Sequence, residues 1–256
     1  MSLLSDTYYL FIRAMKKLIR TPILLFFSLF QPIIFLLLFT QLFGKFSQLP
    51  GFPAGSYLLF ATPGILLQNA FSSALQSGTS VVGDLESGFL QKMLVTPVSR
   101  PAILLGRLVS DAVRVVIQSI IILALAYGLG LSVATGVGGI LLMLLIIAFF
   151  GLAWSGISLT IGLRTKSAET VFGIGAFLTF PLLFMSTALV PAKGFMPDWM
   201  VTVSNYNPIS YTVDAVRVLT LTGYNWSTIL SAFGVIAAIA VVTLGATLYL
   251  FRKVVS

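Results

Sequence analysis

The chain has 256 residues, of which 58% are hydrophobic and 9% are charged, and its mean hydropathy is +1.05. Soluble domains are about 45–50% apolar and about 25% charged, so this composition predicts a protein that lies in lipid. The sequence contains no cysteine and no histidine. This excludes disulfides, thiol nucleophiles, cysteine-ligated metals and histidine-based catalysis. We therefore expect neither a catalytic site nor a metal site.

The N-terminal segment, residues 1–21, has the pattern of an amphipathic helix. Its apolar residues Leu4, Tyr8, Phe11, Met15 and Leu18 recur at helical spacing, and its basic residues lie mostly on the other side. We expect the helix to lie in the membrane interface with its basic face toward lipid headgroups. The alternative is a simple basic flank that anchors the first span.

Six membrane spans are predicted in residues 22–256, because a helix needs about 20 apolar residues to cross the hydrocarbon core. Two glycine clusters, Gly128-Leu-Gly130 and Gly136-Val-Gly138-Gly139, divide the longest uncharged run and indicate a tight hairpin. The expected spans are residues 22–44, 57–83, 108–129, 139–163, 169–190 and 228–251. The predicted fold is thus an all-α polytopic membrane protein.

The distribution of basic residues predicts the orientation of these spans. One set of loops and flanks carries Arg13, Lys16, Lys17, Arg20, Lys92, Arg100, Arg107, Arg114, Arg164, Lys166, Arg252 and Lys253, and the other carries Lys45, Lys193 and Arg217. Under the positive-inside rule the larger set is cytoplasmic, which places both termini inside. The net charge of +8 therefore reflects loop charges. Basic residues that interact with nucleic acid would form one patch, so we expect no nucleic-acid partner.

The connection between spans two and three, residues 84–101, predicts a short helix on the cytoplasmic side. Leu85, Phe89 and Met93 fall on one face, and Pro97 and Pro101 end the helix and set the direction of span three. Such a helix offers a surface for a soluble partner. The alternative is an ordinary polar loop.

The connection between spans five and six, residues 189–226, is too apolar for a solvated loop and too interrupted by proline for a full span. Tryptophan and tyrosine at headgroup depth indicate external re-entrant half-helices. Asp214 and Arg217, three residues apart, are predicted to pair on one helical face.

Two motifs resemble the permease of type-2 ATP-binding-cassette exporters. They are LVTPVSRPAILLGR, which follows Asp84 and Glu86, and NPISYTVDAVR, which contains Pro208, Tyr211 and Arg217. The resemblance covers the whole chain, including the six spans. It implies an exporter of an amphipathic drug, antibiotic, lipid or glycolipid in a bacterial or archaeal cytoplasmic membrane. It also implies a homodimer of this chain with two copies of a separate ATPase subunit.

The resemblance also assigns roles to residues. The coupling segment would dock in a groove of the ATPase through Asp84, Glu86, Phe89, Met93, Pro97 and Arg100. Asp84 and Glu86 would form salt bridges to the ATPase or to the basic N-terminal helix, while Pro97 and Arg100 would fix and dock the coupling helix. An external gate would include Pro208, Tyr211, Asp214 and Arg217.

The chain itself has no nucleotide-binding motif. Its nearest approach to a P-loop, Gly162 to Ser167, has threonine where glycine is required. ATP and Mg²⁺ are therefore expected on the partner ATPase. The alternative is an ion-gradient-driven secondary transporter or a channel, which would need ionisable groups at mid-membrane. An intramembrane enzyme would need paired carboxylates or a Ser–Lys dyad at one depth, and the spans contain neither.

Polar and aromatic residues inside the spans are the candidates for a translocation path. They are Gln31, Gln68, Asn69, Ser72 and Gln76, with Phe172, Phe177 and Thr179 in span five. A cavity between two copies, with a polar stripe and a phenylalanine wall, would suit an amphipathic molecule. The alternative is that these groups bond neighbouring helices, at about 0.6 kcal/mol each.

Overall fold

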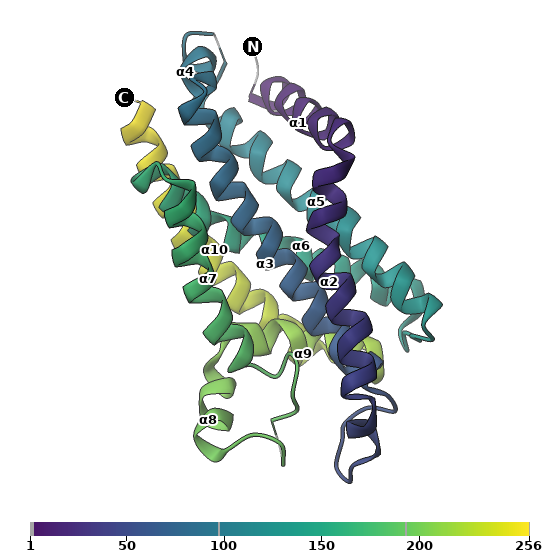
Figure 1. Ribbon diagram of the computed structural model, residues 1–256. Coiled ribbons are helices and arrows are strands. Elements are labelled where there is room, and N and C mark those ends of the chain that lie inside the picture. Colours follow the sequence, from purple (N-terminus) through teal and green to yellow (C-terminus); the bar gives the residue numbers. More distant parts are fainter. Residues whose placement is uncertain (1–2, 97, 193, 256) are drawn as a thin grey trace.

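The computed structural model describes residues 3–96, 98–192 and 194–255, and within these ranges every regular element is helical (Figure 1). Both termini and α4 lie at one end of the molecule, here called the terminal end, and η1 and α8 lie at the opposite, distal end (Figure 1). The elements are α1 (Leu3–Arg20), α2 (Pro22–Leu42), η1 (Gly44–Gln48), α3 (Tyr57–Glu86), α4 (Phe89–Leu94), α5 (Arg100–Gly128), α6 (Gly136–Thr165), α7 (Ala168–Phe184), α8 (Asp198–Tyr206), α9 (Pro208–Leu221) and α10 (Trp226–Val255).

Four of the described helices, α3, α5, α6 and α10, are long and apolar enough to cross a membrane. The apolar stretches Phe26–Leu42 of α2 and Ala168–Phe184 of α7 are shorter. The prediction of an all-helical protein with several apolar helices is therefore confirmed. Both termini also lie at the same end, as an even number of spans requires (Figure 1).

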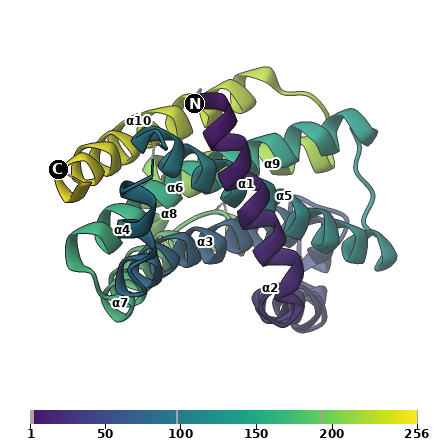
Figure 2. The ribbon, with the colours of Figure 1, turned by 90° about the horizontal axis from the view of Figure 1, so that it is seen from above.

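Helix α1 forms as predicted and lies against α5 at the terminal end (Figure 2). Thr21 separates it from α2, whose first residue is Pro22. Gly106 allows the close approach, because a Cβ there would stand 2.8 Å from Leu10 Cβ. Asp6, which the sequence places with the polar face, is 3% exposed and accepts a hydrogen bond from the Ser99 N–H at 3.0 Å. A side chain of α1 thus binds the backbone just before α5.

Helix α3 lies at the centre of the bundle and packs against α2, α5, α6, α7 and α9. Its tightest contact is with α6, where Ser158 Oγ donates to the Ala74 carbonyl and where a Cβ on Gly78 would clash with the Ser158 backbone. Phe71 meets the rings of Phe150 and Trp154 edge-on beside this seam. Small residues at this contact let two backbones approach closely, as is common in membrane bundles.

The segment between α7 and α10 contains two short helices, as predicted for residues 189–226. Helix α8 is largely exposed, whereas α9 packs against α3, α6 and α10. Asn207 starts α9 by accepting from the Ile209 N–H at 2.9 Å, and its amide donates to the Leu182 carbonyl at 2.7 Å. This residue therefore joins the end of α7 to the beginning of α9.

The helix containing the third predicted span begins at Arg100, whereas the span was expected from residue 108. Pro101 is tolerated in the first turn, where a missing N–H breaks no helical hydrogen bond. The charged residues that follow are paired with α3, as described below, so the helix continues through them. The coupling helix α4 is correspondingly short, and Leu85 belongs to α3.

Two further boundaries were wrong. Gly136 to Gly139 form the first turn of α6, and the reversal occupies residues 129–135, with Gly130 at φ +99°. Helix α7 ends at Phe184 although the span was expected to reach residue 190, because the chain turns after the internal Pro181. At this end of α7 the Met185 N–H donates a hydrogen bond to the Pro181 carbonyl at 2.9 Å.

Candidate functional site

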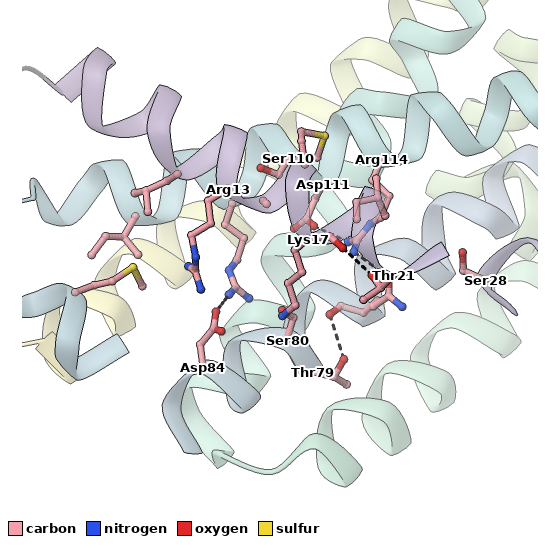
Figure 3. A pocket seen from close by; sticks show the side chains of 18 residues that line it. Arg13, Lys17, Thr21, Ser28, Thr79, Ser80, Asp84, Ser110, Asp111 and Arg114 are labelled. Atoms are coloured by element: carbon pink, nitrogen blue, oxygen red, sulfur yellow. Dashed lines mark hydrogen bonds and ion pairs between the residues drawn. The ribbon is translucent and has the colours of Figure 1, made fainter. Parts of the chain in front are cut away.

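A cavity of about 330 Å³ opens at the terminal end between α1, α3 and α5. Its ionisable lining consists of Arg13 and Lys17 from α1, Asp84 from α3, and Arg107, Asp111 and Arg114 from α5. Figure 3 shows Arg13 and Lys17 extending from α1 toward Asp84 and Ser80 of α3. Arg13 and Lys17 of the predicted basic face therefore line this cavity, and the contact of that face with lipid headgroups remains a prediction.

The floor of the cavity is a hydrogen-bonded network between α3 and α5. Arg114 forms an ion pair with Asp111 one turn earlier and also donates to Ser73 Oγ at 3.0 Å and Gln76 Oε1 at 2.9 Å. Asp111 in turn accepts from the Ser77 hydroxyl. Every charge in this network has an opposite charge or a hydrogen-bond partner, which is what burial of ionised groups requires.

A second ion pair lies closer to the terminal end. Arg107 pairs with Asp84 and donates to the Ser77 carbonyl at 3.1 Å. Among the described residues Asp84 therefore pairs with α5 and not with the N-terminal helix, and a salt bridge between Asp84 and the ATPase remains a prediction. Both side chains are less than one-fifth exposed.

Helix α4, the predicted coupling helix, is in direct contact with α1. The guanidinium carbon of Arg13 lies 3.6 Å from the centroid of the Phe89 ring. Met93, from the same short helix, lines the cavity. The predicted partner face of α4 is thus partly covered by the chain itself.

The other predicted coupling residues have different surroundings. Glu86 and Arg100 are exposed at the ends of α3 and α5 and are open to a partner. Pro97 lies outside the described residues. The roles assigned to this set remain predictions.

The candidate translocation residues do not share one surface. Gln31 is exposed on α2, Ser72 is partly buried, and Gln76 binds Arg114 in the cavity. Phe172 and Phe177 are 62% and 76% exposed on the outside of α7.

Three members of this set are buried in the bundle with unpaired polar atoms. Gln68, Asn69 and Thr179 are each less than 8% exposed. Gln68 Oε1, both amide atoms of Asn69 and Thr179 Oγ1 have no hydrogen-bond partner in the described part of the chain. A path through these residues remains a prediction.

All four predicted gate residues lie on α9, and one of them, Arg217, is buried. Arg217 pairs with Asp214 at 2.7 Å, as predicted from their spacing, and its guanidinium carbon lies 3.9 Å from the centroid of the Phe60 ring. It also donates to the Thr187 carbonyl, and the Thr187 hydroxyl donates to Asp214 at 2.8 Å. Pro208 is the first residue of this helix, and Tyr211 is partly buried one turn later. Arg217 thus joins α9, α3 and the turn after α7.

Sequence reasoning missed the chemistry of α5. Arg107 and Arg114 were counted as loop charges, and Ser73 and Ser77 were not connected with them. A signal was present in the spacing of polar residues: Arg107 and Arg114 are seven apart on α5, and their partners Asp84 and Gln76 are eight apart on α3. Among the described residues there is no group of three acidic side chains that would hold a metal ion.

A family model described as ABC-2 type transporter matches residues 5–221. The chain is 32% identical over 208 residues to the daunorubicin resistance ABC transporter permease protein DrrB1 of Streptomyces coeruleorubidus, covering 81% of this chain and 72% of the relative.

Two other relatives are similar over comparable lengths. The putative transport permease ycf38 of Cyanophora paradoxa is 33% identical over 84% of this chain and 74% of its own length. The probable doxorubicin resistance ABC transporter permease protein DrrC of Mycobacterium tuberculosis is 24% identical over 82% of this chain and 75% of its own length.

Proposed function

The chain belongs to the ABC-2 type transporter permease family, and we propose that it is the membrane subunit of an exporter driven by a separate ATPase. In this proposal α2 and α7 join the four longer apolar helices as spans, and α8 and α9 form an external re-entrant segment. The terminal end is cytoplasmic, in a bacterial or archaeal membrane. The excess of basic residues in the loops and flanks at that end supports this orientation.

The observation that best supports ATPase coupling is the contact between Arg13 of α1 and Phe89 of α4. Helix α4 sits between two spans at the terminal end, next to exposed Glu86 and Arg100. Helix α1 is also tied to α5 through Asp6. A force applied to α4 by a soluble partner would therefore reach both the amphipathic helix and the spans α3 and α5.

The proposed assembly contains two permease copies and two ATPase subunits, with ATP and Mg²⁺ held by the latter. The outer face of α7 supports a second copy, because its phenylalanines at 172, 177, 180 and 184 are 47–76% exposed. The proposed cargo is an amphipathic drug, antibiotic, lipid or glycolipid that leaves the cytoplasm or the inner leaflet. Two relatives are named for resistance to daunorubicin and doxorubicin.

The proposal is tested by gentle extraction of the chain and assay of the ATPase that copurifies with it. Replacing Glu86 and Arg100 by alanine should lower stimulated ATPase activity while leaving membrane insertion unchanged. The matched control is Lys166→Ala with Glu169→Ala, because both residues are exposed between α6 and α7 and carry the same two charge types. Full coupling in the Glu86/Arg100 variant would remove the assignment of the coupling segment.

The alternative of an ion-gradient-driven transporter or channel makes a different prediction for the same experiment. In that case the chain would purify as a homogeneous species with no ATPase, and reconstituted flux would follow an imposed ion gradient. Asp111 lies about three turns into α5, but it is paired with Arg114. The structure therefore offers no unpaired acid there for ion coupling.

A further inference from the structure

The cavity at the terminal end carries an excess of positive charge. Four cationic side chains and two carboxylates line it. Each carboxylate already has its own arginine, in the pairs Asp84–Arg107 and Asp111–Arg114. Arg13 and Lys17 therefore supply two uncompensated positive charges to the space between α1 and α3.

These two side chains have donors to offer a ligand. The face of the Arg13 guanidinium stacks on Phe89, which leaves its N–H groups in the guanidinium plane free to donate. Neither the Arg13 nor the Lys17 side chain has a hydrogen bond or an ion pair to another residue in the part of the chain that the structure describes. Hydroxyls from Ser80 and Ser110 add further polar groups to the wall.

Part of the wall is apolar. Leu10 and Leu18 of α1 and Ile103 of α5 line the cavity. A ligand with a charged head and an apolar tail would thus find a matching surface for each part.

We propose that this cavity binds the phosphate group of an anionic amphiphile, with the phosphate between Arg13 and Lys17 and the apolar part against Leu10, Leu18 and Ile103. Arginine and lysine are the side chains that most often bind phosphate, through charge-assisted hydrogen bonds. The volume of about 330 Å³ is within the range of small-molecule pockets. Placing the amphiphile in the cytoplasmic leaflet rests on the proposed function, whereas the binding itself does not.

The test is calorimetric titration of the purified full-length chain in neutral detergent. The probes are dioctanoyl phosphatidic acid, dioctanoyl phosphatidylcholine and inorganic phosphate. Replacing Arg13 and Lys17 by glutamine should weaken binding of phosphatidic acid by about tenfold or more, because charge-assisted hydrogen bonds to the phosphate are lost. Lys17→Gln alone leaves the Arg13–Phe89 contact intact. It should nevertheless weaken the binding of phosphatidic acid.

The matched control is Lys16→Gln with Arg20→Gln. These residues are exposed on the same helix and do not line the cavity, so the control removes the same charge. Its binding should stay close to that of the unmodified chain. Equal weakening in both double variants would overturn the site, since general attraction to basic residues, about 1 kcal/mol for each, would then explain the binding.

The other probes identify the source of the phosphate. Phosphatidylcholine that binds as tightly as phosphatidic acid would overturn the proposal, because its headgroup has no net charge. Displacement of phosphatidic acid by inorganic phosphate, with the same loss in the Arg13/Lys17 variant, would support the phosphate site and assign it to a soluble anion. Failure to displace it would assign the site to lipid. No ATPase is present, so failure here is distinguishable from failure of the proposed coupling.

Discussion

Arg13 of the amphipathic helix stacks on Phe89 of the coupling helix, with 3.6 Å between the guanidinium carbon and the ring centroid. Seventy-five intervening residues separate them in the chain, so this contact fixes the position of one peripheral helix relative to another. A cation over an aromatic face contributes about 0.5–1 kcal/mol when exposed and about 2 kcal/mol when desolvated. The contact therefore adds a modest stabilisation to the position of α4 beside α1, well below the cost of ordering the six residues of α4, about 1–2 kcal/mol for each.

The first prediction concerns this contact. Phe89→Ala should reduce stimulation of the partner ATPase, because α4 would lose its connection to α1. Phe89→Trp should retain most of the stimulation, since indole is the best aromatic partner for a cation. The measurement is ATPase activity of the reconstituted complex. Val95→Ala, six residues later at the C-terminal end of α4 and 87% exposed, serves as the control, and an equal loss in that variant would contradict a specific role for Phe89.

The second prediction concerns the packing of α1 against α5. Gly106→Val should displace α1, because the new Cβ would meet Leu10 Cβ at 2.8 Å and the Thr7 carbonyl oxygen at 3.2 Å. Overpacking of this kind costs about 1–3 kcal/mol. Hydrogen exchange of residues 3–20 should become faster. Gly83→Val is the control because nothing lies within 4 Å of a Cβ there, and exchange in α1 should then remain unchanged.

The third prediction concerns the pair Asp84–Arg107. Asp84→Asn and Arg107→Gln should be non-additive in the free energy of unfolding, with a coupling energy of about 0.5–3 kcal/mol for residues in direct contact. The free energy of unfolding is measured in mixed micelles for the unmodified chain, the two single variants and the double variant, which together form a double-mutant cycle. The parallel cycle of Glu86→Gln with Arg107→Gln should be additive, because Glu86 is exposed and makes no ion pair with Arg107 in the described structure. Additivity in both cycles would contradict the pair.

The fourth prediction concerns Arg217. Arg217→Lys should lower the thermal unfolding midpoint, because one ammonium group cannot pair with Asp214, reach the Thr187 carbonyl and cover the Phe60 ring at once. Truncation that leaves buried acceptors unpaired costs about 1–3 kcal/mol for each group. Arg252→Lys, on an exposed residue, should leave the midpoint unchanged. Identical midpoints for the two variants would show that Arg217 contributes only its charge.

Hydrophobic periodicity and charge placement predicted the helices well. The amphipathic helix, the long apolar helices, the short helix between spans two and three, and the two short helices after α7 were all expected from the sequence. The Asp214–Arg217 pair was also expected, because residues three apart on a helix are neighbours. Each of these features depends on residues that are close in sequence.

The features that were missed depend on contacts between distant segments. The extension of α5 back to Arg100 requires Arg107 and Arg114 to find partners on α3, and those partners are 23 and 38 to 41 positions away. The burial of Asp6 and the inward direction of Arg13 depend on where α1 settles on α5. Local periodicity assigns a residue to one face of a helix, but the packing of that helix decides what the face meets.

The polar contacts between α3 and α5 also restrict how these helices can move. Arg107 and Arg114 are two turns apart and meet groups that lie two to three turns apart on an antiparallel neighbour. Sliding by one turn, about 5.4 Å, would carry both arginines past their partners at once. These contacts therefore hold the two helices in one register, and we expect α3 and α5 to move together during transport and not to slide past each other.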